Sequence, residues 1–348
     1  MLSIAIMLII DGYQTTQLYE DGIQSDLFAY RHLSVEKRNI QHSLRSRCSD
    51  VDSRLDYFLD ANYVVSLIGR LKEYDEIAAN ISNFIERFYY KFLRGNGYKF
   101  MIVMPAADRS LLDVVMKETP DDNVKKMLLR SVAEAIQYLH GKRLLHGDIK
   151  ALNIVRANEN DIRLIDLDAS LKLDSDYAGA KFSSGVLPPE MFAVLSKSEK
   201  TEFENHFKGV DKNLWTKVEP VRDSERDCFY VVRAFDSRKG IANMMENGNF
   251  LRKGTAAIDI WAFGVLMYYM LSVGNQNLFT VDNNDDLSNV KDFREMIHMT
   301  DDTMVNRIRR CVQEPLAADL LMQILKINPL ERLPFKNILV SYTLLFKF

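Results

Sequence analysis

The chain has 348 residues, with 45 Lys and Arg against 48 Asp and Glu, which gives a formal net charge of −3. This near-neutral balance argues against a dedicated nucleic-acid-binding protein, since such proteins carry a strongly basic surface. The chain is 47% hydrophobic and contains only 15 Gly and 8 Pro, which excludes fibrous and largely disordered classes. A chain of this length forms two domains or one large unit with two lobes.

The cysteines and the N-terminal segment suggest where the protein resides. Cys48, Cys228 and Cys311 are odd in number and far apart in sequence, so we expect neither a disulfide framework nor a zinc site, and we expect a cytoplasmic, reducing environment. Met1–Ile10 is apolar except for Ser3 but is only about half as long as a membrane-spanning helix of roughly 20 residues. We therefore expect a buried strand there rather than the remnant of a membrane segment, and no membrane attachment.

Hydrophobic patterning predicts mainly strands before residue 105 and helices after it. The first part is predicted to contain strands at residues 63–69 and 98–104, the second closed by Pro105, and a helix at 75–93 between them. The second part is predicted to contain a helix at residues 123–140, short strands at 153–155 and 163–165, a loop to 190, an irregular polar segment to about 253 with a strand at 228–235, and helices from 256 onwards. This order favours an α+β fold over alternating βαβ units.

The motif that carries chemistry is LLHGDIKALNIV at residues 144–155, followed closely by LIDLD. Phosphoryl transfer needs a carboxylate that orients the attacking hydroxyl, a cation near the migrating phosphate, and oxygen ligands for magnesium. The residues that offer these groups are Asp148, Lys150, Asn153 and Asp166. Each residue alone has an ordinary structural explanation, so the inference depends on their joint spacing.

This spacing resembles the eukaryotic protein kinase superfamily, whose catalytic loop has Lys two residues and Asn five residues after a catalytic Asp, followed by an Asp-Phe-Gly turn. The resemblance implies that Asp148 is the catalytic base and that Lys150 contacts the transferred phosphate. It also implies that Asn153 and Asp166 are magnesium ligands and that ATP is the phosphate donor. A Lys two residues after the Asp is similar to serine/threonine kinases rather than tyrosine kinases.

The resemblance implies a bilobal protein-kinase-like fold. A small β-rich N-lobe would occupy residues 1–104, and a larger helical C-lobe would occupy residues 105–348. Within the C-lobe, residues 144–155 would form the catalytic loop, residues 166–190 the activation segment, and residues of about 191–253 an insertion.

Three later motifs follow in the order of the family. PPE, ending at Glu190, resembles the Ala-Pro-Glu that closes the activation segment. DIWAFG, beginning at Asp259, resembles the start of a buried central helix whose Asp braces the catalytic loop. NPLER, ending at Arg332, resembles the Asp-Pro-x-x-Arg near the end of the domain and implies an ion pair between Arg332 and Glu190.

MIVMPAA at residues 101–107 resembles the last N-lobe strand and the hinge, where backbone groups bind adenine. Pro105 has no N–H but keeps its carbonyl, and Ala107 keeps its N–H, so both groups that adenine needs are present. The resemblance implies that Met104 is the gatekeeper residue and that Val155 forms the apolar floor under the base.

The resemblance is weak before this hinge. No Gly-x-Gly-x-x-Gly loop occurs in the sequence, so the cover over the phosphates is missing, altered or lost from a truncated gene. LFAYR, ending at Arg31, resembles the strand that carries an ATP-contacting Lys, with Asp50 or Asp52 as its acidic partner. Lys37 and Lys72 are alternatives for this role.

Several positions after the hinge also depart from the family. Gly147 stands where many relatives have an Arg that receives a phosphorylated activation loop, so we expect no control by that route. Leu167 and Asp168 replace the Phe and Gly that follow the metal-binding Asp. Ser183 stands where serine/threonine kinases commonly have Thr, and Val186 stands where the family often has Tyr.

The insertion at about residues 191–253 is much longer than the corresponding connection in ordinary relatives. Long insertions in surface loops are thermodynamically tolerable. Two interpretations are open: a decorated loop, or an element that docks a partner or substrate.

Two main hypotheses of function follow. The first is an ATP- and magnesium-dependent protein serine/threonine kinase acting on a protein substrate, because all four chemical residues are present. The second is a pseudokinase that binds nucleotide or acts as a scaffold, because the glycine loop and the strand Lys are not recognisable. A small-molecule kinase is less favoured, since such enzymes generally lack the Pro-Glu, Asp-x-Trp and terminal Arg motifs.

Overall fold

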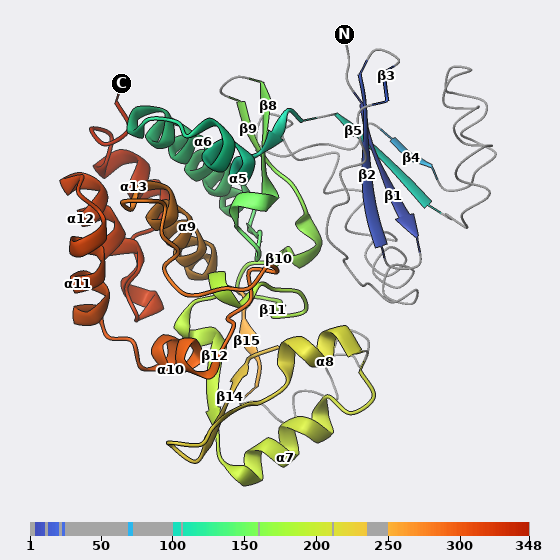
Figure 1. Ribbon diagram of the computed structural model, residues 1–348, viewed down its shortest axis with the longest axis vertical. Helices are drawn as coiled ribbons and strands as arrows, with labels where there is room; N and C mark the ends of the chain where they lie inside the picture. Colours follow the sequence, from blue (N-terminus) through green and yellow to red (C-terminus); the bar gives the residue numbers. More distant parts are fainter. Residues whose placement is uncertain are drawn as a thin grey trace. The chain divides into compact units, whose positions relative to one another are not determined.

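The computed structural model describes the backbone of five N-terminal strands and most of the chain after Pro105. Beyond the strands, the described residues are 107–158, 161–210, 212–234 and 250–347, and side chains are described only within these ranges. The chain divides into two compact units, Met1–Asp108 and Arg109–Phe348 (Figure 1). The assignment of these units as the N-lobe and C-lobe stays a prediction.

The first unit contains a five-stranded antiparallel sheet in the order β3-β2-β1-β5-β4. Its strands are β1 Ile4–Ile10, β2 Tyr13–Glu20, β3 Ile23–Gln24, β4 Gly69–Leu71 and β5 Phe100–Pro105. The strands expected at the N-terminus and before the hinge are thus confirmed. Pro105 belongs to β5 rather than following it, opposite Ile4, and the ladder tolerates it because β4 pairs only with residues 101–103.

Several sequence predictions fall on residues outside the described part of the chain. These are the helix at 75–93, most of the strand at 63–69, the proposed ATP-contacting residue Arg31, its alternatives Lys37 and Lys72, and the acidic candidates Asp50 and Asp52. They stay predictions.

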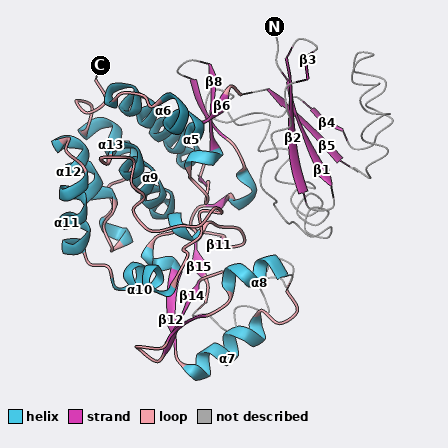
Figure 2. Cartoon of the chain, in the orientation of Figure 1, coloured by secondary structure: helices cyan, strands magenta, loops and turns pink. Residues whose placement is uncertain are grey.

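The core of the second unit surrounds α9, Ala256–Leu271, most of whose residues are buried. Helices α6, Asp122–Gly141, and α12, Pro315–Ile324, contact α9, and α13, Phe335–Ser341, packs on α6 (Figures 1 and 2). Although α9 is apolar on all sides, neither it nor any other described helix is long and apolar enough to cross a membrane. It is instead the buried central helix that the sequence predicts.

Local sequence signals set the bounds of α6. The carboxylate of Asp121 accepts hydrogen bonds from the amides of Asn123 and Val124 at 2.9 Å, which caps the helix. The helix ends at Gly141, the predicted stop, so the helix expected at residues 123–140 is confirmed. Its buried face includes Val132 and Ile136.

Short strands frame the catalytic loop. Strands β6 Arg109–Ser110, β8 Ile154–Asn158 and β9 Asp161–Leu164 form one antiparallel sheet, and β7 Leu144–Leu145 pairs with β10 Leu171–Lys172. The hairpin of β8 and β9 corresponds to the two short strands predicted there. At the end of the insertion, β15 Arg252–Lys253 pairs with β11 Tyr177–Ala178. The remaining elements outside the insertion are α5 Leu111–Asp113 with a π turn at Val114–Glu118, α10 Val290–His298 and α11 Asp301–Cys311, together with short 3-10 turns at Ala151–Asn153, Leu167–Ala169, Ser184–Val186, Pro189–Met191 and Pro329–Glu331.

The insertion is more ordered than the sequence patterning predicts. It contains α7 Lys197–His206, α8 Lys212–Val218 and an antiparallel sheet of β12 Phe192–Leu195, β14 Cys228–Val232 and β13 Val221–Asp223. The expectation of an irregular polar segment was therefore wrong, although its predicted strand at 228–235 is present as β14. The reason is a capping box between Ser196 and Glu199, followed by Phe203 and Phe207, which are buried one helical turn apart.

Candidate functional site

Asp259, in the first turn of α9, connects the central helix to the catalytic loop. Its Oδ2 accepts a hydrogen bond from the amide of His146 and its Oδ1 accepts one from the amide of Gly147, each at 2.9 Å. Burial alone would raise the pKa of Asp259, but hydrogen bonds from His140 and from the loop amides outweigh it and hold the pKa below its ordinary value. The bracing role implied by the sequence is thus confirmed.

The ring of His146 fixes the path of the loop. The amide of Asp148 donates to Nδ1 at 3.3 Å, while Nε2 lies 3.0 Å from the carbonyl oxygen of Ile165. A carbonyl only accepts hydrogen bonds, so the proton resides on Nε2 and Nδ1 is the acceptor. This single ring therefore holds the catalytic loop against the segment that leads to Asp166.

The carboxylate of Asp148 is buried and only half engaged. Its side chain is held by Asn153, whose Nδ2 donates to Oδ2 of Asp148 at 2.9 Å and to its backbone carbonyl at 2.9 Å. Asp148 is only 2% exposed, and its Oδ1 has no hydrogen-bond partner within the described part of the chain. Burying an acceptor without a hydrogen bond costs free energy, and a donor that binds to this oxygen would remove that cost.

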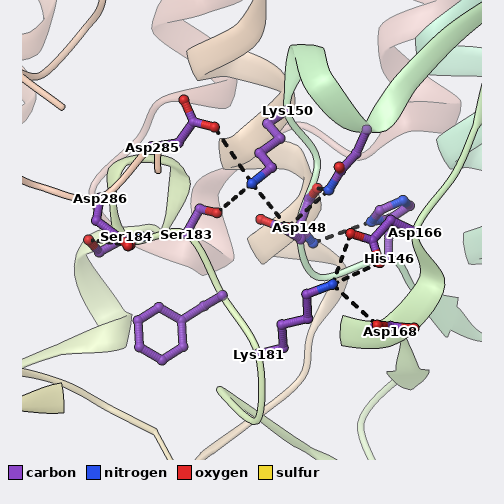
Figure 3. A network of polar contacts seen from close by, with 12 residues as sticks. His146, Asp148, Lys150, Asp166, Asp168, Lys181, Ser183, Ser184, Asp285 and Asp286 are labelled. Carbon is purple, nitrogen blue, oxygen red and sulfur yellow. Dashed lines mark hydrogen bonds and ion pairs between the residues drawn. The ribbon is translucent and has the colours of Figure 1, made fainter. Parts of the chain in front are cut away.

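The side chain of Lys150 extends from the catalytic loop to the activation segment (Figure 3). Its Nζ donates to Oγ of Ser183 at 2.8 Å and lies 3.5 Å from Oδ2 of Asp148 and 3.6 Å from Oδ2 of Asp285. The ammonium therefore stands beside the carboxylate that the sequence singles out, with a hydroxyl of the activation segment fixing its direction.

Asp166 has a left-handed backbone, with φ of 63°, and its carboxylate is bound by Lys181 of the activation segment (Figure 3). The Nζ of Lys181 lies 2.8 and 2.9 Å from the two carboxylate oxygens of Asp166 and 3.4 Å from Asp168. Burial opposes the charge on Asp166, but the ammonium of Lys181 holds the pKa of this carboxyl below its ordinary value. The two carboxylates correspondingly raise the pKa of Lys181, against the effect of its burial.

The donor set around Asp166 fits a magnesium ion. Carboxylate and amide oxygens are the ligands that magnesium prefers, and Asp166, Asp168 and Asn153 offer only these types. Among the described residues, no group of three or more acidic, His or Cys side chains could hold a metal. Magnesium is usually held by one or two carboxylates together with substrate phosphates. Lys181 already places one positive charge on these oxygens.

The residues predicted to bind adenine belong to different parts of the chain. Val155 is buried in β8, opposite Ser110 of β6, and Ala107 is half-buried just before β6. Met104 and Pro105 lie at the end of β5, where only their backbone is described. Their roles at a hinge stay predictions.

The predicted ion pair of Glu190 with Arg332 is confirmed. Two nitrogens of the guanidinium, Nη1 and Nη2, bind the two carboxylate oxygens at 2.6 and 2.7 Å. Trp261 of α9 lies under the guanidinium, with the ring centroid 4.9 Å away. The end of the activation segment is thereby fixed to the helical core.

Three residues in or beside the activation segment belong to no motif in the sequence. Lys181 is an isolated lysine in a polar loop, and no spacing rule links it to Asp166. Asp285 and Asp286 belong to an acidic turn far along the chain, which is typical of any solvated loop. Only the folded chain brings these charges beside the activation segment.

A family model described as protein kinase domain matches residues 65–204 of the chain. The serine/threonine-protein kinase ppk11 of Schizosaccharomyces pombe is 33% identical over 106 residues, which cover 28% of this chain and 33% of that protein. The serine/threonine-protein kinase shk1/pak1 of the same yeast is 31% identical over 97 residues, covering 28% of this chain and 14% of that protein. The mouse serine/threonine-protein kinase 10 is 45% identical over 47 residues, 14% of this chain and 5% of that protein.

These relatives are longer than the matched region, and the chain spans a third or less of each of them. The matched residues include the catalytic loop and Glu190 of the activation segment, whereas their partners Asp259 and Arg332 lie beyond the matched region. The α+β fold, the catalytic-loop motif and these matches together support the eukaryotic protein kinase superfamily as the family of this chain.

Proposed function

We propose that this chain is an active protein serine/threonine kinase, which uses ATP and magnesium to phosphorylate a protein hydroxyl. The observation that carries the proposal is the buried, unpartnered Oδ1 of Asp148 among the described residues, beside the ammonium of Lys150. This oxygen can accept a hydrogen bond from a substrate hydroxyl, which orients the hydroxyl and receives its proton.

In this proposal the reaction proceeds in line at the γ-phosphorus of ATP. The substrate oxygen forms a bond to phosphorus, the bond to the leaving oxygen of ADP breaks, and Asp148 takes the hydroxyl proton. Lys150 provides a positive charge for the phosphoryl oxygens, and its hydrogen bond to Ser183 keeps that charge in place. Positioning and electrostatic stabilisation are the main contributions a protein can make to this reaction.

Asn153 and Asp166 would hold the magnesium ion in this proposal. A bound magnesium ion neutralises charge on the phosphates and orients them. Asn153 has a second task, since its amide fixes Asp148 through two hydrogen bonds. The residues proposed to contact adenine are those of the Met104 to Ala107 segment and Val155.

The deciding experiment compares phosphate transfer from magnesium-ATP to generic protein substrates by the wild type and by Asp148→Asn. The variant is isosteric but cannot accept the proton, so we expect its rate to fall by about 10²- to 10⁴-fold. Asp302→Asn, at an exposed position in α11, is the matched control and should leave the rate unchanged. Equal rates for the wild type and Asp148→Asn would refute the proposal.

One observation supports the alternative of a pseudokinase. The ammonium of Lys181 already neutralises Asp166, so a protein cation could replace the metal permanently. In that case the purified wild type would bind ATP, as measured by calorimetry, but would incorporate no phosphate at any magnesium concentration. Magnesium-dependent transfer that Asp166→Ala abolishes would exclude this alternative.

A further inference from the structure

The activation segment from Lys181 to Ser184 presents its residues in two opposite directions. Lys181 and Ser183 contact Asp166 and Lys150 of the candidate site. Phe182 and Ser184 instead contact Lys217 of the insertion and Asp286, neither of which is hydrogen-bonded to or ion-paired with Asp166 or Lys150 in the described part of the chain. This alternation is that of an extended chain, in which successive side chains point to opposite sides. Whatever holds the second pair therefore also sets the position of the first pair.

The second pair is held by Lys217, which comes from helix α8 of the insertion. Its Nζ donates to the carbonyl oxygen of Phe182 at 2.9 Å and lies 5.5 Å from the centroid of the same ring. It also pairs with Oδ2 of Asp286 at 2.9 Å. Phe182 is buried, so the carbonyl and the ring that Lys217 contacts are fixed in the core.

Asp286 bridges Lys217 and Ser184. Its Oδ1 accepts hydrogen bonds from the amide of Ser184 at 2.8 Å and from its hydroxyl at 3.1 Å. The hydroxyl oxygen of Ser184 in turn accepts a hydrogen bond from the amide of Leu287 at 2.9 Å (Figure 3 shows Ser184 beside Asp286). Lys217 neutralises the carboxylate that makes these bonds and is itself only about one-third exposed.

We propose that Lys217 is a positioning residue: the insertion uses it to fix residues 182–184, and thereby aligns Ser183 with Lys150 and Lys181 with Asp166. The contacts are made by unmodified side chains, so the alignment needs no phosphate on the segment. Helix α8 of the insertion then has a role in positioning the residues of the kinase site and is not merely an addition to the surface. The kinetic part of this inference rests on the proposed function, whereas the structural part does not.

Hydrogen exchange of the amides at residues 184–187 tests the structural part. These amides donate to Asp286, Asp285, Ser183 and Ser184, so their exchange reports the order of the segment. In Lys217→Met we expect their exchange to accelerate by about tenfold or more, because a charged hydrogen bond contributes at least that factor to local opening. Protection in α9 should stay unchanged.

Two variants act as controls for this measurement. Lys212→Met, at an exposed position on the same helix, should leave exchange at 184–187 unchanged. Lys217→Arg keeps the charge and the donors, and it should restore most of the protection. Unchanged exchange at 184–187 in Lys217→Met would overturn the inference. If that variant fails to fold, Asp286→Asn replaces it, since it removes the partner charge of Lys217 but keeps an oxygen for Ser184.

The kinetic measurement separates this inference from the proposed function. If the wild type transfers phosphate, Lys217→Met should lower kcat/KM by about tenfold and Lys217→Arg should recover it, whereas Lys212→Met should not change it. A Lys217→Met variant with faster exchange but an unchanged kcat/KM would overturn the alignment role. If the wild type transfers no phosphate, the proposed function fails, while the exchange data still decide whether Lys217 orders the segment.

Discussion

The buried ion pair of Glu190 and Arg332 allows a quantitative prediction of stability. The Arg332 side chain is fully buried and uses all five of its N–H donors: two bind Glu190, and three bind the carbonyl oxygens of Lys326, Ala257 and Ile327. Glu190→Gln removes the counter-charge and leaves the guanidinium uncompensated in the core. Breaking a buried pair in this way lowers the free energy of unfolding by about 3–5 kcal/mol.

For a unit of this size, each kcal/mol changes Tm by about 2–4 °C, so Tm should fall by roughly 6–20 °C. Thermal and urea denaturation, followed by far-UV circular dichroism and by tryptophan fluorescence, to which Trp261 under the guanidinium contributes together with Trp215, measure this loss. In the double variant Glu190→Gln/Arg332→Met, the loss should be smaller than the sum of the two single losses, because both variants remove the same pair.

The matched control is Asp227→Asn, which breaks a pair with Lys197 whose side chains are both about two-thirds exposed. This variant should change Tm very little, since solvent already screens the pair. If Glu190→Gln lowers Tm no more than Asp227→Asn, the reasoning from burial is refuted.

Three further predictions concern the loop, the metal site and the insertion. Gly147 has φ of +83°, and a Cβ there would lie 2.6 Å from the carbonyl oxygen of Ala169, so Gly147→Ala should lower the free energy of unfolding by at least about 1–2 kcal/mol in urea titrations. Gly141→Ala, where a Cβ meets nothing within 4 Å, should not, and equal losses would contradict the steric argument. Lys181→Met should increase Mn²⁺ affinity by about tenfold in paramagnetic resonance titrations with ADP present, since the ammonium no longer competes for Asp166; an unchanged affinity would show that it does not compete. Hydrogen bonds from Arg294 hold the pKa of Asp223 well below its ordinary value of 3.8. The pair therefore stabilises the fold fully above about pH 3.8, and this stabilisation is lost as the pH falls from there through the lowered pKa. The stability difference between the wild type and Asp223→Asn should therefore shrink in urea titrations below about pH 4, and a difference that is constant with pH would contradict this.

The motifs with fixed local spacing could be predicted from the sequence. The bracing of the catalytic loop by Asp259 and the pairing of Glu190 with Arg332 were both expected, although the second pair is 142 residues apart in sequence. Each of these residues belongs to a short motif that can be recognised from several neighbouring positions at once. Once the motifs were recognised, the resemblance to the family predicted which of them contact each other, which their spacing alone could not.

The contacts of single lysines could not be predicted in this way. Neither Lys181 nor Lys217 belongs to a recognisable motif, and exposure on the surface is the commonest outcome for a lone lysine. Their partners are set by tertiary packing. The insertion was mispredicted for a different reason. Half of the residues of α7 are charged, which favoured an irregular polar segment, whereas the capping box at Ser196 was the sequence signal that indicated a helix.

The two ends of the insertion are both attached to the activation segment. Its first strand, β12, begins two residues after Glu190, and its last strand, β15, pairs with β11 inside that segment. The next residue, Gly254, donates to the carbonyl oxygen of Asp176 at 2.9 Å and accepts from the amide of Asp174 at 2.8 Å. In mechanical terms, the insertion is anchored at both of its ends to the same segment of the chain. A force on the insertion is therefore transmitted to the activation segment at both of its ends, through the chain after Glu190 and through the pairing of β15 with β11.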